Sequence, residues 1–225
     1  MGGPAASGYA EQVPDRDHGA LAAIGGQRRY RKGAIVMLEG DHSNFVLLLR
    51  QGQVKLTSTT RDGRELLLGF RGPGDFVGEL AALAGDGEPR SATVTAMDPL
   101  VAQVITAGEF LDYLQQHPSA MLALTRAIIR RLTDADRRRI EYGSYDARGR
   151  VARVLVEIAE KHGRPRDHGI EIGLALSQEE LAGLVAASRE SVARSLTVLR
   201  RRGLVSTGRR SIVVRDLEGL RQFAV

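Results

Sequence analysis

Two short runs of helical periodicity, separated by small and polar residues, limit the fold of this chain more than any other feature of its sequence. They lie between Leu176 and Leu199, in the stretch LSQEELAGLVAASRESVARSLTVL. Ser177 and Glu180 have the spacing of a capping box, in which a hydroxyl and a carboxylate satisfy exposed N–H groups at a helix start. The apolar positions that recur at helical spacing are Leu181, Leu184, Val185, Val192, Leu196 and Leu199. Two helices joined by a compact turn predict a helix-turn-helix.

The second of these helices leaves polar side chains for its N-terminal turn and outer face, namely Ser188, Arg189, Glu190, Ser191 and Arg194. In a DNA-recognition helix the N-terminal residues reach base edges in the major groove. Arginine can pair bidentately with guanine, and glutamate can accept from the amino group of cytosine. The pattern favours DNA binding. The alternative is an ordinary helical hairpin with a charged exposed face, which would have a similar sequence pattern. Ser177, at the start of the first helix, is a further expected DNA contact.

A predicted β-hairpin follows the helix pair. Residues 203–207 and 211–215 flank a turn at Gly208-Arg209-Arg210, as in the wing of a winged helix. The two arginines at its tip suit phosphate contacts. Residues 148–225 hold 15 Lys and Arg against 9 Asp and Glu, a net charge of +6, whereas residues 1–147 hold 17 against 18, a net of −1. This excess indicates a polyanionic partner, with a solvated basic face as the alternative.

The N-terminal half has a different pattern. We expect residues 1–18, which are rich in Gly and Ala, to form a disordered tail. Short β-type runs separated by Gly and Asp then follow, at residues 34–38, 45–49, 54–60, 65–70, 92–96 and 101–105. Closely spaced short strands predict an all-β barrel or sandwich over residues 19–117.

Helical periodicity resumes near Ala107. Residues 109–116 predict a short helix, and Ser119 is the expected N-cap of a long helix that extends to about Tyr142. Spacings of three and four residues separate Leu122, Thr125, Ile129, Leu132 and Asp136 along it. This stripe packs either on its own domain or on the same helix of a second copy.

The sequence therefore predicts a long dimerisation helix and hinge over residues 118–145 and a DNA-binding domain over residues 146–225. The hinge is expected at 142–146, where Gly143 and Ser144 interrupt the helical pattern. Within the DNA-binding domain we expect an amphipathic helix at 150–161, a polar loop at 162–168 and a short strand at 170–172.

A second potential site lies in the β region, in GDFVGELAAL (residues 74–83) followed by PRSATV (residues 89–94). The backbone around Gly78 and the helical turn expected near Glu79 would present N–H groups to a phosphate. Arg90 would supply a forked positive donor and Ser91 a hydroxyl. A Gly-rich turn with a surface ion pair is the alternative, because the spacing is not that of a dinucleotide fingerprint.

The order of these features resembles the CRP/FNR family of bacterial transcription regulators, through GDFVGELAAL…PRSATV and SRESVARSL. The resemblance covers about residues 20–215. It implies an α+β fold with an N-terminal β-roll of the cyclic-nucleotide-binding type, a long dimerisation helix and a C-terminal winged helix-turn-helix. By this resemblance the ligand-binding residues are Gly78, Glu79, Leu80, Arg90 and Ser91. Arg90 and Ser91 would hold the cyclic phosphate and Glu79 the ribose 2′-hydroxyl.

The resemblance also implies that a homodimer binds a palindromic DNA operator with TGTGA-like half-sites, and that RNA polymerase is a partner. Arg189, Glu190 and Arg194 match the family's base-reading positions, and Ser188 and Ser191 match neighbours that contact phosphates. Cyclic AMP is the first candidate effector.

One departure bears on that effector. In cyclic-AMP sensors of the family, neighbouring hydroxyls of the long helix contact the adenine, whereas Ala135 and Asp136 stand at the matching positions here. Alanine cannot donate a hydrogen bond, and an ionised aspartate can only accept. A regulator of the same fold that needs no cyclic nucleotide, or answers to a different ligand, is therefore the alternative.

Other classes of protein lack support in the sequence. The chain has no cysteine, no Walker-type phosphate loop and no HExxH pair, so an enzymatic role is rejected and no metal site is expected. Its five histidines fall in expected tails, turns or loops. No apolar run reaches membrane-spanning length and the N-terminus has no signal-peptide pattern, so we expect a cytoplasmic protein with no membrane partner.

Overall fold

A computed structural model describes Tyr9 and residues 15–60, 63, 65–85, 87–172, 176–208 and 211–224. The chain divides into two compact units. One, called the β domain here, extends from Ser7 to Leu132, and the other, the C-terminal unit, contains Thr133–Val225. The predicted domain limits kept the long helix apart from both domains. The division between the two units falls within this helix, after Leu132, and the predicted limits stay a prediction.

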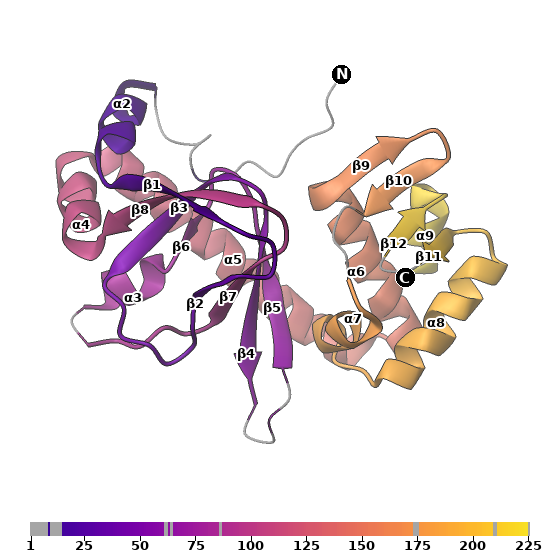
Figure 1. The fold of residues 1–225 in the computed structure, drawn as a ribbon. Helices are drawn as coiled ribbons and strands as arrows, with labels where there is room; N and C mark the ends of the chain where they lie inside the picture. Colours follow the sequence, from indigo (N-terminus) through magenta and orange to yellow (C-terminus); the bar gives the residue numbers. More distant parts are fainter. Residues whose placement is uncertain are drawn as a thin grey trace. The chain divides into compact units, whose positions relative to one another are not determined.

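Two four-stranded antiparallel sheets form the β domain (Figure 1). The first has the order β1-β8-β3-β6 and the second β2-β7-β4-β5. The strands are β1 (Gly26–Tyr30), β2 (Ile35–Met37), β3 (Phe45–Gln51), β4 (Val54–Thr59), β5 (Glu65–Arg71), β6 (Phe76–Val77), β7 (Thr93–Ala96) and β8 (Leu100–Thr106).

All six strands predicted for this region are present, with ends that differ by one or two residues. In β3, Val46–Leu49 are completely buried on both faces of the strand, which explains their continuous apolar run. Strand β1 was not predicted, because its sequence GQRRY is polar and four of its five side chains are exposed. Pairing with β8, rather than burial, places β1 in the sheet.

Helices α3 (Glu79–Ala84) and α4 (Ala107–Gln116) also belong to this domain, as does the first part of α5 (Pro118–Ser144). Thr106 and Glu109 form a capping box at the start of α4. The expected N-cap at Ser119 is wrong. Helix α5 begins at Pro118, whose fixed φ suits a first helical position, and the Ser119 hydroxyl donates to the Asp17 carboxylate.

The disordered tail predicted over residues 1–18 is also wrong for the residues that the structure describes there. Helix α2 spans Asp15–Ala23. The Tyr9 ring is 1% exposed, its centroid lies 4.7 Å from that of Phe76, and its hydroxyl donates to the Ala120 carbonyl at 3.1 Å. Burial raises the pKa of this hydroxyl well above its usual value. Composition did not reveal this contact, because one aromatic residue in a Gly/Ala-rich stretch carries the packing.

The C-terminal unit contains α6 (Ala147–His162), α7 (Gln178–Leu184), α8 (Arg189–Arg201), α9 (Leu217–Phe223) and a four-stranded antiparallel sheet of order β11-β12-β10-β9. Its strands are β9 (Gly163–Arg166), β10 (Gly169–Ile172), β11 (Val205–Gly208) and β12 (Ser211–Val214). The predicted hairpin is β11–β12, and β12 also pairs with β10. Strand β9 replaces part of the loop expected at 162–168; with Pro165 it occupies a sheet edge, where a missing N–H is tolerated.

The helix break expected at 142–146 is confined to Tyr145 and Asp146, because residues 142–144 continue α5. Asp146 caps α6 by accepting from the Gly149 N–H at 2.8 Å. This hydrogen bond, with smaller contributions that include the Arg148 charge, lowers the pKa of the Asp146 carboxyl. Within the described residues, no helix combines the length and the apolarity that crossing a membrane requires.

Candidate functional site

The five residues predicted to bind a ligand surround one small cavity in the β domain. Gly78, Glu79, Leu80, Arg90 and Ser91 all line it, together with residues of β2, β4 and β7. Two segments separated in sequence therefore meet at one place: the β6–α3 junction and the turn before β7. We call this the cassette cavity. Sequence spacing alone could not show that the two segments meet.

Arg90 is the central charge of the cassette cavity. Its side chain is buried, and its guanidinium donates to the Ser43 hydroxyl at 2.9 Å, to the carbonyl oxygens of Ser43 at 2.7 Å and of Gly78 at 2.8 Å, and to that of Phe45. Burial lowers the pKa of the guanidinium, while the carboxylates of Glu79 and Asp41 raise it. The arginine is thereby held in one orientation beside the α3 N-terminus.

Gly78 has a conformation that other residues rarely adopt. It is left-handed, with φ 84° and ψ 2°, at the N-cap of α3. A Cβ here would lie 2.6 Å from Arg90 Nη1 and 2.7 Å from the end of the Met37 side chain. Both the backbone and the close approach of Arg90 therefore require glycine.

Glu79 has a partner that the sequence did not predict. Its carboxylate is buried and accepts from Arg131 Nη1 of α5 at 2.5 Å. A second nitrogen of Arg131 lies 3.3 Å from Asp75 Oδ1. An unpaired buried carboxylate is costly, and the ion pair with Arg131 offsets this cost and holds the Glu79 side chain in place. The ion pair also links the cassette to the long helix. The motif at residues 74–83 could not predict this ion pair, because Arg131 lies 52 residues further along the chain than Glu79.

The other predicted ligand residues lie in more open positions. Leu80 is 48% exposed, and Ser91 is exposed at the rim of the cavity. Ala135 and Asp136, matched to the family's base-contacting positions, are exposed residues of α5 that belong to the C-terminal unit rather than the β domain. Their contact with a ligand remains a prediction.

The cassette cavity has a volume of about 50 Å³. Sites for small ligands typically measure about 300–1,000 Å³. A nucleotide would therefore have to open this cavity, and the Met37 side chain beside Gly78 is one group that would move.

The helix-turn-helix has the geometry that the sequence predicted. Ser177 and Glu180 form the capping box of α7, and Ser188 caps α8 by accepting from the Ser191 N–H at 3.2 Å. Ala186, in the turn between them, has a left-handed φ of 46°. The apolar residues predicted to face the core are all buried: Leu181, Leu184, Val185, Val192, Leu196 and Leu199.

The predicted base-reading residues lie together on the outer surface of α8. Arg189, Glu190 and Arg194 are exposed, and Arg194 donates to the Ser191 hydroxyl at 3.0 Å. Hydrogen bonds from its own N–H and from the Ser188 hydroxyl, with the charges of both arginines, hold the pKa of Glu190 below its usual value. Glu190 is therefore an ionised acceptor at neutral pH. Ser177 is half-buried and its hydroxyl serves the capping box.

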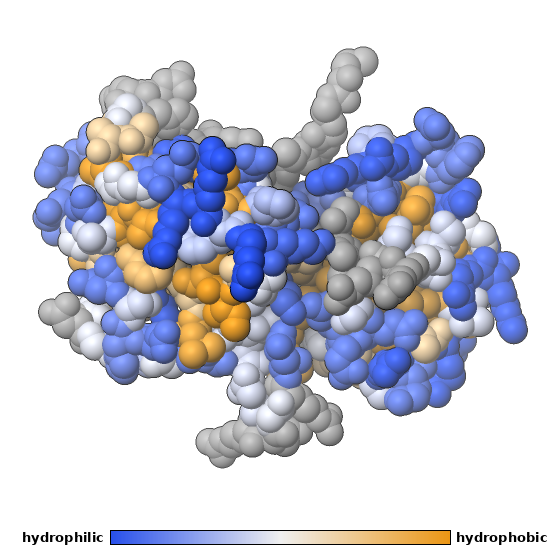
Figure 2. Space-filling model, in the orientation of Figure 1, coloured by the Kyte–Doolittle hydropathy of each residue, from blue (hydrophilic) through white to orange (hydrophobic). Residues whose placement is uncertain are grey.

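Other predicted features of the C-terminal unit are only partly visible. Arg209 and Arg210, at the predicted wing tip, lie outside the described residues. Gly208 pairs with Ser211 where the hairpin closes. In the space-filling view, mainly hydrophilic side chains cover the visible face of this unit (Figure 2). No group of three or more His, Asp or Glu side chains suited to a metal ion occurs among the residues that the structure covers.

Comparison with known proteins identifies both parts of the chain. Residues 27–117 match the model of the cyclic nucleotide-binding domain, and residues 149–223 match that of the Crp-like helix-turn-helix domain. A similar protein is the CRP-like cAMP-activated global transcriptional regulator of Mycobacterium tuberculosis, which is 30% identical over 208 residues, covering 91% of this chain and 92% of that protein.

Solved structures agree with this comparison. A CRP-family transcriptional regulator from Thermus thermophilus is 27% identical, with a TM-score of 0.73 over 88% of this chain and 96% of that one. The c-di-GMP-responsive global regulator CLP of Xanthomonas campestris is 25% identical, with a TM-score of 0.77 over 89% and 99% of the two chains.

Proposed function

Because this chain belongs to the CRP family of DNA-binding transcription regulators, we propose that it acts as a homodimer whose affinity for an operator is controlled by a cyclic nucleotide. The family consists of regulators rather than enzymes, and the chain combines a cyclic nucleotide-binding domain with a helix-turn-helix domain. The observation that carries the effector part of the proposal is the meeting of Gly78, Glu79, Leu80, Arg90 and Ser91 around one cavity.

The operator that we propose is a palindrome with TGTGA-like half-sites. Arg189, Glu190 and Arg194 are exposed on α8 and would read base edges in each half-site. Ser188, Ser191 and the wing arginines Arg209 and Arg210 would contact phosphates. A regulator of this kind acts on transcription by RNA polymerase, which we propose as a partner. We propose the cytoplasm as its location.

A homodimer is supported by α5. Large apolar side chains on this helix are exposed, among them Leu122 at 49%, Ile129 at 55% and Leu132 at 62%. These three belong to the stripe with spacings of three and four residues that the sequence showed. The same helix of a second copy would cover the stripe, as in a short coiled coil.

Cyclic AMP is the first effector that we propose, since the Mycobacterium tuberculosis relative is described as cAMP-activated. Arg90 and Ser91 would hold the cyclic phosphate, and Glu79 the ribose hydroxyl. A ligand hydroxyl that donates to Glu79 would share the Glu79 carboxylate with Arg131 of α5. Such a ligand would bias α5 between two arrangements, provided that its affinity for the two differs.

Two observations favour an alternative effector, or none. Ala135 replaces a hydrogen-bonding side chain where the family contacts adenine, and Asp136 can only accept when ionised. The Xanthomonas campestris regulator is described as responding to c-di-GMP. A cyclic dinucleotide, or no nucleotide, is therefore the second candidate within the same fold.

Calorimetric titration with cyclic AMP, cyclic GMP and cyclic di-GMP tests the effector. Affinity for a duplex with two TGTGA half-sites is then measured with and without the ligand that binds. We expect cyclic AMP to raise this affinity by about 5- to 150-fold, a usual range for coupled sites. Arg90→Lys, which keeps the charge but loses the forked geometry, should remove this response and leave ligand-free DNA binding unchanged. Tight operator binding without heat from any nucleotide would support the alternative.

A further inference from the structure

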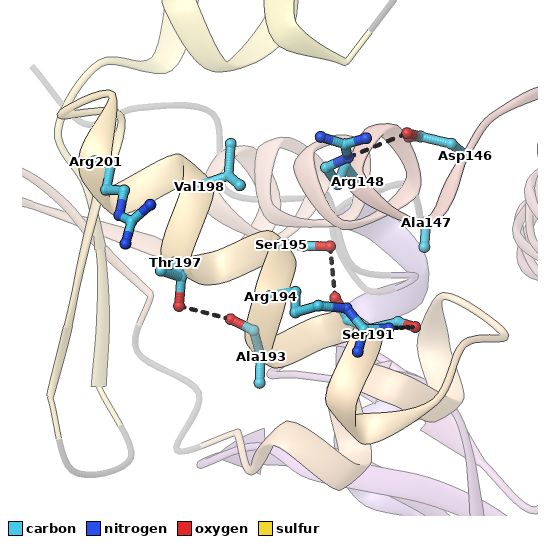
Figure 3. Close-up of a pocket in the computed structure, with 10 residues that line it drawn as sticks. All are labelled: Asp146, Ala147, Arg148, Ser191, Ala193, Arg194, Ser195, Thr197, Val198 and Arg201. Atoms are coloured by element: carbon cyan, nitrogen blue, oxygen red, sulfur yellow. Dashed lines mark hydrogen bonds and ion pairs between the residues drawn. The ribbon is translucent and has the colours of Figure 1, made fainter.

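A concave surface of the C-terminal unit lies next to the predicted base-reading face. It has a volume of about 780 Å³ and is formed by the start of α6 and the outer side of α8 (Figure 3). Its charged lining residues are Asp146, Arg148, Arg194 and Arg201. We call it the α6–α8 groove.

The α6–α8 groove carries an excess of positive charge, with three guanidinium groups against one carboxylate. Arg148 Nε lies 3.3 Å from Asp146 Oδ2, but both side chains are more than half exposed, and exposed pairs of this kind are weak. Arg201 makes no ion pair or side-chain hydrogen bond within the described part of the chain. The groove therefore offers guanidinium donors to an anion.

Of the three hydroxyl groups that line the groove, those of Ser195 and Thr197 already donate within α8. Ser195 donates to the Ser191 carbonyl at 2.7 Å, and Thr197 donates to the Ala193 carbonyl at 2.9 Å, both within α8 (Figure 3). The donors left for a ligand are chiefly those of Arg201 and of the exposed Arg148, whose planar guanidinium groups match the geometry of phosphate oxygens. This lining suits a phosphodiester better than a base edge.

We propose that the α6–α8 groove binds the phosphodiester backbone of one DNA strand, with Arg201 and Arg148 as contacts additional to the base-reading set. The inference rests on the proposed DNA-binding function and extends its protein surface beyond the α8 N-terminus and the wing.

The dimensions of α8 support this assignment. Glu190, Arg194, Thr197 and Arg201 follow one another at spacings of four, three and four residues, which places them on one helix face. Arg201 lies roughly 10 Å further along the axis than Arg194, at about 1.5 Å per residue. The major groove is only about 8.5 Å deep. If the N-terminal end of α8 enters the major groove so that Arg194 reaches base edges, Arg201 lies at the height of the backbone phosphates.

The salt dependence of DNA binding measures such contacts, because each neutralised phosphate contributes about −0.9 to the slope of log K against log salt concentration. We compare the full chain with Arg201→Gln and Arg148→Gln, on the TGTGA duplex and on a duplex of random sequence. Arg166→Gln is the control. It removes the same charge from β9, where Arg166 pairs with Glu171 at 2.8 Å. We expect each groove variant to flatten the slope by about one on both duplexes and Arg166→Gln to leave it unchanged.

A second measurement locates the contact. Duplexes are prepared that each carry one neutral methylphosphonate linkage in one strand beside the half-site. The linkage that most reduces the DNA affinity of the unsubstituted protein is then tested with Arg201→Gln. We expect that linkage to reduce the DNA affinity of the unsubstituted protein about 3- to 10-fold, because a single phosphate contact contributes only part of the electrostatic affinity. The affinity of the variant should fall less than about 1.5-fold.

The outcomes separate the two proposals. Specific binding to the TGTGA duplex with equal salt slopes for Arg201→Gln, Arg148→Gln and Arg166→Gln would overturn the groove proposal and leave the operator proposal intact. Equal affinity of the unsubstituted protein for both duplexes, with the slope still flattened by Arg201→Gln, would support the groove and overturn the proposed operator. Absence of binding to either duplex would overturn both.

Discussion

At the scale of single residues, the cassette cavity depends on buried charges whose hydrogen-bonding capacity is satisfied within the domain. Arg90 and Glu79 are each 4% exposed, and removing either charge from water is unfavourable unless its hydrogen-bonding capacity is satisfied. Carbonyl groups of the β3 segment and Gly78 satisfy Arg90, whereas Arg131 satisfies Glu79. A ligand phosphate or hydroxyl would compete with these internal partners. Ligand binding at this site would therefore directly change the hydrogen bonds that Arg90 and Glu79 make within the protein.

The predicted base-reading residues of α8 have the opposite character, because they are exposed and held only by local contacts. Arg189→Ala should reduce affinity for the TGTGA duplex by about 1–3 kcal/mol and relax preference at one base pair in each half-site. Competition binding against duplexes substituted at single positions measures both effects. Arg202→Gln, on the same segment but stacked on the Phe223 ring at 4.8 Å, is the control for loss of charge. Unchanged preference in Arg189→Ala would mean that α8 docks in another register.

At the scale of elements, Tyr9 and Leu21 of α2 are part of the β-domain core. The Tyr9 ring packs between strand and helix residues, beside Phe76, whose centroid lies 4.9 Å from that of Phe110. Phe76 stands two residues before Gly78 in the β6–α3 segment. Tyr9 thus supports the strand that leads into the cassette cavity, a contact unexpected from the composition of residues 1–18.

Tyr9→Ala should therefore lower the free energy of unfolding of the β domain by about 3–5 kcal/mol, as large aromatic-to-alanine changes in cores do. Tyr9→Phe keeps the ring and loses only the hydrogen bond to Ala120, so its cost should be about 0.5–1.5 kcal/mol. Urea denaturation with a probe specific to the β domain measures both. A cost below about 0.5 kcal/mol for Tyr9→Ala, as at an ordinary surface position, would show that the segment does not pack there in solution.

At the scale of the whole molecule, α5 spans the division between the two compact units. Its exposed apolar stripe is the feature most suited to joining two copies, and its Arg131 contacts the cassette. The same helix would thus support the dimer and sense the ligand. Unequal ligand affinity for two arrangements of α5 is the condition for regulation.

Leu132→Glu should weaken dimerisation by about 3 kcal/mol or more, over about a hundredfold in dissociation constant, because the interface would bury an unpaired carboxylate. Arg130→Gln changes the net charge by the same amount at a position off the stripe and is the control. Sedimentation velocity across a concentration series gives the result. A variant that remained dimeric at the same concentrations as the control would place the dimer interface elsewhere.

The local features of this fold were predictable from the sequence because they depend on neighbouring residues. Capping at Ser177, the buried apolar positions of α7 and α8, the six strands of the β region and the β11–β12 hairpin all arise from periodicity and turn chemistry. The cassette residues were likewise identified by a motif whose spacing is local.

Only the tertiary structure decided which distant groups meet. It placed polar β1 beside β8 and edge strand β9 beside β10, buried Tyr9 against Phe76, and paired Arg131 with Glu79. It also formed the α6–α8 groove from residues of two helices. Backbone hydrogen bonds at a sheet edge, a single aromatic contact and an ion pair across 52 residues leave no periodic pattern in the chain. Their energy comes from partners that become neighbours only when the chain has folded.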